Sequence, residues 1–381
     1  MSSGRRPGKP VGERFATRFT VVSHALARRL KAPGLARAPR SPARVLLAHH
    51  LLLGDTIMLS PLIAKLRANH PACEIAMTVP PAIAPLYAGA PWGVRALPFS
   101  PRDARTVRDL VREGPFDLAI VPGDNRQSWL AAAMGARHVV AHAGDTPATK
   151  NWFVDATRPY RDRPAAWGDL VADLVDGPDA PPFAPGDWPA PPAPPGDRPK
   201  KPYVVLHLGA STPLKLWPAD RWMNLAASFA RRGFTVVWSA GPGEEHLVGE
   251  ADPAHRHAST AGRLDLAQLW HLLAGASLLV APDTGVAHLG RAAWTPTVAL
   301  FGPGSAVVCS PGGFWRDSPW RAVTIEDFPC RDQRLLFRRE LAWVRRCART
   351  PAQCEAPRCM QAIGVDSVLA AADGLLAQAG A

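Results

Sequence analysis

Short apolar runs alternate with stretches of helical spacing along most of the chain. After residue 44, predicted strands at 45–48, 74–79, 94–97, 118–121 and 138–140 alternate with helical patterns at 55–69, 107–112 and 129–134. The alternation resumes with strands at 203–208, 234–239, 278–281 and 297–301 and helices at 219–231, near 244, at 266–273 and at 365–376. This order predicts an α/β fold with two parallel sheets, each covered by helices.

A proline-rich stretch separates the two patterns. Eleven prolines fall within the 25 residues 178–202, which favours an extended connector over a helix or sheet. The predicted division is a basic arm at 1–43, an N-terminal domain at 44–177, a linker at 178–202, a C-terminal domain at 203–364 and a final helix at 365–381. A length of 381 residues suits two domains of this kind.

The basic residues concentrate near the N-terminus. Of the net charge of +12, +10 comes from residues 1–44, which hold eleven Lys and Arg residues against one acid, Glu13. Because the rest of the chain is nearly neutral, no nucleic-acid partner is expected. For the tail itself, contact with nucleic acid, contact with anionic lipid and a purely solubilising role stay open.

Within this tail, apolar residues recur at helical spacing: Phe15, Phe19, Val22, Leu26 and Leu30. Because arginines lie between them, residues 14–30 are predicted to form a basic amphipathic helix on an anionic membrane surface. Docking of the helix on the protein's own surface and disorder are the alternatives. The arginines interrupt every apolar run, so a secretory signal is not expected, and prolines break the longest uncharged span, so no transmembrane helix is predicted.

The six cysteines do not suggest a disulfide framework in a chain of this size, so we expect a reducing, cytoplasmic location, with peripheral attachment to the inner membrane through the arm. Four of them, Cys330, Cys347, Cys354 and Cys359, cluster late in the sequence. They contain no Cys-x-x-Cys pair, so ordinary thiols are favoured over a zinc or iron site.

The stretch 278–303 joins two buried strands through a polar turn and a short helix. Asp283 suits the N-cap position, which would place Thr284 and Gly285 in the first helical turn with free backbone amides. Those amides and the helix dipole suit a phosphate or another anion, and His288 lies one turn later, on the face toward Thr284. Taken alone, Asp-Thr-Gly is more simply a plain helix cap.

A second loop offers a positively charged side chain for binding an anion. The strand at 203–208 ends in Gly-Ala-Ser at 209–211, and the loop after it carries Lys215 before Trp217 and Pro218 begin a helix. A proline suits the first turn of a helix, where no amide donor is needed. Such a loop can hold a phosphate with its lysine.

These features together resemble the family 9 glycosyltransferases, the lipopolysaccharide heptosyltransferase family. Gly-Ala-Ser at 209–211, Lys-x-Trp-Pro at 215–218, Gly-Pro-Gly-Glu-Glu at 241–245 and Asp-Thr-Gly-x-x-His at 283–288 follow the family's order and spacing. Leu-Gly-Asp-Thr-Ile-Met-Leu-Ser-Pro-Leu at 53–62, followed by Leu66-Arg67 and His70-Pro71, is similar to its N-terminal motif. The resemblance implies the GT-B architecture, in which two Rossmann-like domains with parallel sheets face each other across a cleft.

Besides Lys215, the candidate catalytic residue is Asp55. From the residues alone, it is either a helix N-cap or a carboxylate aimed into the cleft, because the turns 49–55 and 122–125 follow strands whose carboxyl ends line such clefts. The resemblance implies the second role, with Asp55 as general base on an acceptor hydroxyl. It also implies inverting transfer of a sugar, heptose from ADP-heptose being expected first, onto a glycolipid or lipopolysaccharide core.

The other candidate residues are those expected to hold the nucleotide-sugar donor: Gly54, Ser211, Thr212, Lys215, Glu244, Glu245, Asp283, Thr284, Gly285 and His288. Lys215 and the amides of Thr284 and Gly285 would stabilise the departing diphosphate without a metal or other cofactor, since the chain has no Asp-x-Asp motif. Asp283 and His288 would contact sugar or phosphate. Glu245, and with less support Glu244, would contact the ribose.

Two rival functions fit the same cleft. A nucleotide-sugar epimerase of related fold would act on the donor alone, without an acceptor. A nucleotide-sugar-binding or scaffold protein would not need Asp55.

Overall fold

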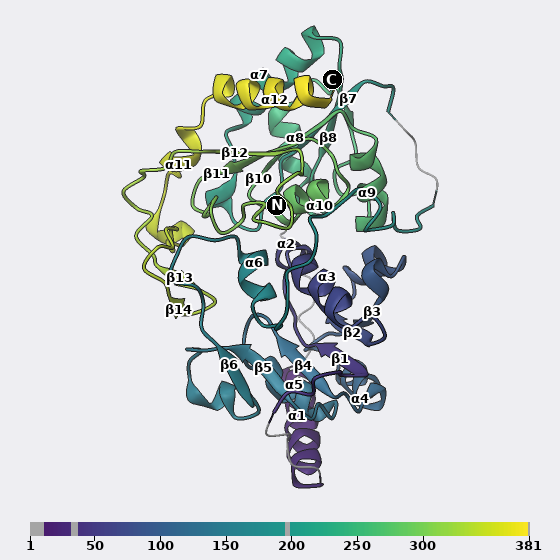
Figure 1. Ribbon diagram of the computed structural model, residues 1–381. Helices are drawn as coiled ribbons and strands as arrows, with labels where there is room; N and C mark the ends of the chain where they lie inside the picture. The colour runs from purple at the N-terminus through teal and green to yellow at the C-terminus, as the bar shows by residue number, and fades with distance from the viewer. Residues whose placement is uncertain (1–10, 32–36, 195–198, 380–381) are drawn as a thin grey trace.

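The computed structural model describes residues 11–31, 37–194 and 199–379, and the predictions for residues 1–10 and for parts of the arm and linker, 32–36 and 195–198, lie outside them. Two six-stranded parallel sheets form two lobes, one above the other in Figure 1. The predicted pair of parallel sheets is therefore confirmed.

The N-terminal sheet has the strand order β3-β2-β1-β4-β5-β6. Its strands are β1 (Arg44–Leu47), β2 (Glu74–Val79), β3 (Val94–Pro98), β4 (Leu118–Val121), β5 (Val139–His142) and β6 (Ala156–Arg158). Neighbouring residues of β1 point to opposite faces: Val45 and Leu47 join one apolar cluster, while Leu46 joins another. The sheet is thus buried on both sides, as its unbroken apolar strands predict.

The C-terminal sheet repeats this topology in the order β12-β11-β10-β7-β8-β9. Its strands are β7 (Tyr203–His207), β8 (Thr235–Ser239), β9 (Ala258–Ser259), β10 (Leu278–Pro282), β11 (Thr297–Phe301) and β12 (Trp320–Thr324). In each sheet the order reverses between two central strands, β1 and β4 or β7 and β10. Ligands of open α/β sheets bind in the crevice beyond the carboxyl ends of such strands.

Helices cover both sheets (Figure 1). Those of the N-terminal domain are α2 (Leu53–Ile57), α3 (Ser60–Asn69), α4 (Ala104–Glu113), α5 (Gln127–Ala133) and α6 (Trp167–Ala172). Those of the C-terminal domain are α7 (Ala219–Arg231), α8 (Glu245–Ala251), α9 (Leu266–Ala274), α10 (Gly285–Ala292), α11 (Arg358–Gln361) and α12 (Val365–Ala379).

The single helix predicted at 55–69 is wrong, because the structure has two helices there. The first, α2, ends at Ile57, and α3 begins at Ser60 with Pro61 in its first turn. Proline has no amide proton and fits a first turn, where none is needed, far better than a helix interior. The break lets α2 stay short and point its N-terminus at the other domain.

The predicted N-terminal helix is confirmed as α1 (Val11–Lys31). It packs against α4 and α5 on the N-terminal domain, and Ala25 is fully buried in the core beneath them. One face of the helix is therefore docked on the protein's own surface, while its other face is exposed. None of the helices in the described part of the chain combines the length and apolar character that a bilayer crossing needs.

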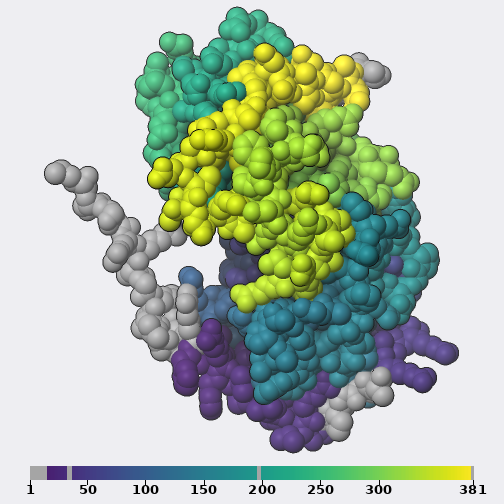
Figure 2. All heavy atoms as spheres, turned by 90° about the vertical axis from the view of Figure 1, so that its left-hand side faces the viewer, coloured from purple at the N-terminus to yellow at the C-terminus, as the bar shows by residue number. Residues whose placement is uncertain are grey.

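A hairpin that the apolar pattern does not predict, formed by β13 (Leu335–Leu336) and β14 (Arg339–Glu340), reaches from the C-terminal segment to the N-terminal domain. Figure 2 shows this yellow-green part of the chain lying directly on the blue N-terminal domain. Its turn residues Phe337 and Arg338 have positive φ values of 46° and 67°. Neither is the glycine or asparagine that marks such turns in a sequence, which is why the hairpin was missed.

Candidate active site between the two domains

The two domains touch where α2 and α10 meet. Gly54 on α2 lies so near His288 that a Cβ atom at position 54 would be 2.9 Å from the imidazole Cδ2. A Cβ atom on Gly285, which begins α10, would be 2.7 Å from the Cβ of Leu53. Glycine at both positions allows the close approach, so the predicted residues of the two halves come together at one point.

Asp55 lies in the first turn of α2 and does not cap it. The N-cap residue is Leu52, and no side chain caps the helix. The pKa of Asp55 is raised to about 6, chiefly by burial and to a lesser degree by the Asp283 carboxylate, while Lys215 and Arg346 offset part of the rise. An N-terminal-domain carboxylate thus lies near charged groups of the C-terminal domain. Asp55 lines the cavity described below and is not the N-cap of α2, and its role as a base stays a prediction.

Asp283 pairs with Lys215. The Lys215 Nζ atom lies 2.7 Å from Asp283 Oδ2 and donates to the Asp283 carbonyl oxygen at 2.9 Å. The predicted N-cap role of Asp283 is wrong: Thr284 caps α10, its Oγ1 accepting a hydrogen bond from the Val286 amide. The reason is that Asp283 still belongs to the sheet, because its amide donates to the Leu300 carbonyl. Its carboxylate is therefore free for Lys215.

His288 is buried at the domain contact. Burial, followed by the charges of Arg291 and Lys215, holds its pKa well below the usual range, so the imidazole is neutral. Its Nδ1 atom has no hydrogen-bond partner among the described residues. A buried polar atom without a partner is costly, so a ligand that supplies one would be stabilised here.

The loops after β7 and β8 carry the other predicted donor residues. Ser211 is exposed, and Thr212 caps the short turn that leads to Lys215. The Glu244 carboxylate accepts hydrogen bonds from the Ala210 and Gly241 amides, at 3.1 and 2.8 Å, and so joins the two loops. Glu245 is exposed and accepts a bond from the Gly243 amide at 3.0 Å.

A cavity of about 230 Å³ opens beside Asp55. It is lined by His49, His50, Leu51, Leu52, Asp55, Asp124, Gln127 and Phe337. The turns after β1 and β4 thus meet at a cleft, as predicted. Burial, with a smaller effect of His50, lowers the pKa of His49 to about 3, and its Nδ1 accepts from the Leu51 amide. The proton must then sit on Nε2, a buried donor without a partner among the described residues.

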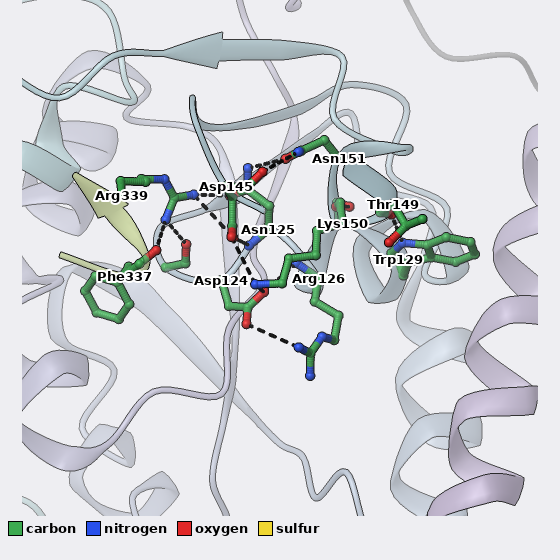
Figure 3. Close-up of polar contacts among 12 residues, drawn as sticks. Asp124, Asn125, Arg126, Trp129, Asp145, Thr149, Lys150, Asn151, Phe337 and Arg339 are labelled. Atoms are coloured by element: carbon green, nitrogen blue, oxygen red, sulfur yellow. Dashed lines mark hydrogen bonds and ion pairs between the residues drawn. The ribbon is translucent and has the colours of Figure 1, made fainter. Parts of the chain in front are cut away.

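Behind this cavity, Arg339 of the hairpin is buried in the N-terminal domain (Figure 3). Its guanidinium donates to the carbonyl oxygens of Gly123, Phe337, His142 and Ala143 and to the Asn125 side chain. The Asp145 carboxylate lies 3.5 Å away and also binds Lys150, which in turn reaches Asp124 at 3.0 Å. This network fixes the loop after β4 and the hairpin against each other.

The family profile of glycosyltransferase family 9, described as heptosyltransferase, matches residues 105–314, more than half of the chain. The chain belongs to this family. Lipopolysaccharide heptosyltransferase 1 of Pseudomonas aeruginosa is 29% identical over 313 residues, which cover 75% of this chain and 85% of that protein. The protein is therefore a glycosyltransferase of the heptosyltransferase family.

Solved structures agree in fold. A family 9 glycosyltransferase from Veillonella parvula has a TM-score of 0.68 at 17% identity and covers 88% of this chain and 98% of its own. ADP-heptose LPS heptosyltransferase II of E. coli has a TM-score of 0.65 at 19% identity, covering 89% and 99%. The predicted GT-B architecture of this glycosyltransferase is confirmed.

Among the residues that the structure describes, one group of side chains could hold a cation. Ligand atoms of Asp283, His288 and Cys309 all lie within 4.8 Å of one another. The Lys215 ammonium already neutralises Asp283, and burial, with the Asp283 charge, raises the pKa of the Cys309 thiol well above its usual range. A neutral thiol and a lysine-paired carboxylate are poor metal ligands. All six cysteines are free.

Sequence reasoning missed several residues of this candidate site. Arg346 adds positive charge near Asp55, and Phe337 forms one wall of the cavity. Both come from the segment between β12 and α11, where apolar residues do not recur at the spacing of a helix or a strand. His49 was not among the predicted site residues, although it begins the turn 49–55 at the carboxyl edge of the sheet.

Proposed function

We propose that this glycosyltransferase moves heptose from ADP-heptose to a hydroxyl group of a lipopolysaccharide core glycan, with inversion at the anomeric carbon. Family membership and the likeness to an E. coli heptosyltransferase whose name includes ADP-heptose support the choice of donor. The observation that carries the proposal is the approach of the Asp55 carboxylate to the Lys215–Asp283 pair across the domain contact. A general base, Asp55, and a group that can stabilise an anion, Lys215, thereby face each other in one cleft.

Asp55 acts as the general base. An acceptor hydroxyl in the adjoining cavity would lose its proton to Asp55 while its oxygen attacks the anomeric carbon. The bond from that carbon to the diphosphate breaks, and its electron pair leaves with the diphosphate. A pKa of about 6 keeps Asp55 ionised at neutral pH and makes it a stronger base than an ordinary aspartate.

The C-terminal domain stabilises the leaving diphosphate. Lys215 supplies a charge, and the amides at the N-terminus of α10, those of the N-cap Thr284 and of Gly285, have no carbonyl partners within the helix. Asp283 holds Lys215 in place until phosphate arrives and, with His288, contacts phosphate or sugar. Ser211 and Thr212 border the same loop, and Glu245, helped by Glu244, contacts the ribose.

Transfer in this proposal needs neither a metal ion nor another cofactor. The charge that develops on the diphosphate is met by Lys215 and by helix amides, which act electrostatically as a metal would. The Asp283, His288 and Cys309 group is in this view part of the sugar and phosphate contact. The partners are a nucleotide-sugar donor and a glycolipid acceptor, and no nucleic acid.

The class of acceptor also suggests where in the cell the enzyme acts. A lipopolysaccharide core is attached to lipid A, a membrane lipid, and the donor is water-soluble. We therefore propose that the enzyme works in the cytoplasm at the inner membrane.

The test is release of ADP from ADP-heptose by the purified protein, with and without a lipid A–core acceptor. The proposal expects ADP release only when the acceptor is present, and a product heavier by one heptose. Binding of ADP-heptose without release would favour the binding or scaffold protein. Conversion of the donor sugar without acceptor would favour the epimerase. UDP-glucose serves as the control donor.

A further inference from the structure

Helix α1 carries an apolar stripe that points away from the protein. The five apolar residues spaced along it, Phe15, Phe19, Val22, Leu26 and Leu30, are between 38% and 85% exposed. Intervals of three and four residues place them on one side of an α-helix. They are five of the eleven large apolar side chains that are exposed in the described part of the chain, so the surface is concentrated on this helix.

The opposite side of α1 is fixed to the N-terminal domain. Ala25 is fully buried, and Thr17 is nearly so. Arg28 donates to the Val111 carbonyl at 3.1 Å, and Arg29 forms an ion pair with Asp155 at 2.7 Å. Arg28 and Arg29 are two of the arginines that lie between the apolar residues of the predicted membrane-surface helix, and the expectation that they contact lipid is wrong. They hold the helix to α4 and to the loop before β6, and so keep the apolar stripe facing outward.

The surroundings of the stripe are basic. Arg18 and Lys31 on α1 are exposed, as are Arg105 and Arg108 on the neighbouring α4, where Arg112 forms an ion pair with Asp109 at 3.0 Å. The first 44 residues carry eleven Lys and Arg residues against one acid. A ridge of phenylalanine and leucine flanked by arginine complements a bilayer that has anionic headgroups above an apolar interior.

An exposed tryptophan lies beside the helix that α1 covers. Trp152 is 66% exposed, and its ring centroid is 5.6 Å from that of Trp129 on α5, the helix against which α1 packs. Phe153 packs on Trp129 at 4.7 Å and receives Arg29 over its ring. Trp152 is thus held on the same part of the domain as α1, and tryptophan is favoured at membrane interfaces.

We infer that the outward stripe of α1 inserts into the headgroup region of an anionic lipid bilayer and holds the enzyme on its surface. The helix has 21 residues and is therefore about 31 Å long, enough to lie flat in the interface. The apolar side chains enter the acyl boundary, and the exposed basic residues contact lipid phosphates. The inference rests on the proposed function only for the choice of membrane, since lipid binding needs no sugar transfer.

The test is flotation of the full-length protein with vesicles of phosphatidylcholine alone or of phosphatidylcholine mixed with phosphatidylglycerol. The protein should float with the mixed vesicles and only weakly with the neutral ones. The variant Phe15→Ser/Phe19→Ser/Leu26→Ser should lower the floated fraction at least about tenfold, because it removes most of the apolar area. Raising the salt concentration should release only part of the bound wild type, because screening leaves the apolar contact intact.

The substitutions are confined to exposed side chains because deleting α1 would uncover the core around Ala25. Met223→Ser, at an exposed apolar position on α7, is the matched control and should float like wild type. The triple variant should keep its melting temperature and its transfer rate on a soluble core oligosaccharide, so loss of binding is separable from loss of function. Equal flotation of the variant and wild type would overturn the inference. So would a dimer that the triple variant turns into a monomer without any vesicle binding by the wild type, since the stripe would then bind a second copy.

Discussion

The Lys215 ammonium lies 2.7 Å from the Asp283 carboxylate, at the N-terminal end of α10 and near Asp55 of the other domain. Without a nucleotide, this pair neutralises both charges. A diphosphate that enters the cleft offers Lys215 more negative charge than Asp283 does, so the lysine can turn to it with little movement. Asp283 thus keeps the lysine extended toward the binding site.

Lys215→Ala should therefore weaken ADP binding by about 1.5–3 kcal/mol, or roughly 10- to 150-fold, the range for hydrogen bonds to a charged group. Isothermal titration calorimetry with ADP measures this directly. Lys201→Ala, at an exposed position in the linker, is the control and should bind ADP like wild type. If Lys215→Ala binds ADP unchanged, Lys215 has no part in the diphosphate site.

The rate of transfer should fall at low pH. Asp55 must be ionised to accept a proton, and its pKa is about 6, so kcat/KM should level off above pH 7 and decline tenfold per pH unit well below 6. If kcat/KM does not change with pH down to pH 5, a group other than Asp55 accepts the proton of the acceptor hydroxyl.

The raised pKa also means that ionised Asp55 destabilises the folded protein. It is raised from 3.8 to about 6 in the folded protein, so between these values the folded state binds more protons than the unfolded state. Stability therefore decreases as pH rises through this window, and the full cost remains above it. Asp55→Asn should raise the melting temperature at pH 8 and change it little at pH 4. Asp220→Asn, exposed at the start of α7, is the control.

Transfer should persist in EDTA. Lys215 and the amides of α10 supply the positive potential that a metal would otherwise provide. Activity assayed before and after dialysis against the chelator tests this point. Loss of activity that one divalent ion restores would instead assign a metal to Asp283, His288 and Cys309.

Arg339 should stabilise the packing of the β13–β14 hairpin on the N-terminal domain. Arg339→Ala leaves carbonyl oxygens and part of Asp145 without a donor in a buried network, a loss of about 3–5 kcal/mol in the free energy of unfolding. Urea unfolding measures it. Arg338→Ala, the exposed neighbour in the same turn, should change stability by less than about 1 kcal/mol. Equal effects of the two substitutions would show that the network adds nothing specific.

Much of the fold follows from local pattern. The strands β2, β4 and β11 and the helix α7 have the predicted bounds, because each is a run of apolar residues closed by turn residues or caps. The turns after β1 and β4 could also be placed at the cleft, because carboxyl ends of parallel strands share one edge. These arguments need no knowledge of distant residues.

Features that depend on distant parts of the chain could not be predicted. Asp283 suits an N-cap by local rules, but its amide is bound to Leu300 of the neighbouring strand, so the cap passes to Thr284. Arg28 and Arg29 suit a lipid-facing role until Val111 and Asp155 are seen to bind them. Phe337 reaches the cavity only because a hairpin of two positive-φ residues turns there.

The central claim is that Asp55 is the base of a sugar transfer, and the variant Asp55→Asn tests it most directly. Asparagine keeps the size of the side chain but cannot accept the proton. With ADP-heptose and a lipid A–core acceptor, turnover should fall by about 10²- to 10⁴-fold while the affinity for ADP stays near that of wild type. Turnover close to that of wild type would contradict the account, because the acceptor proton would then go elsewhere.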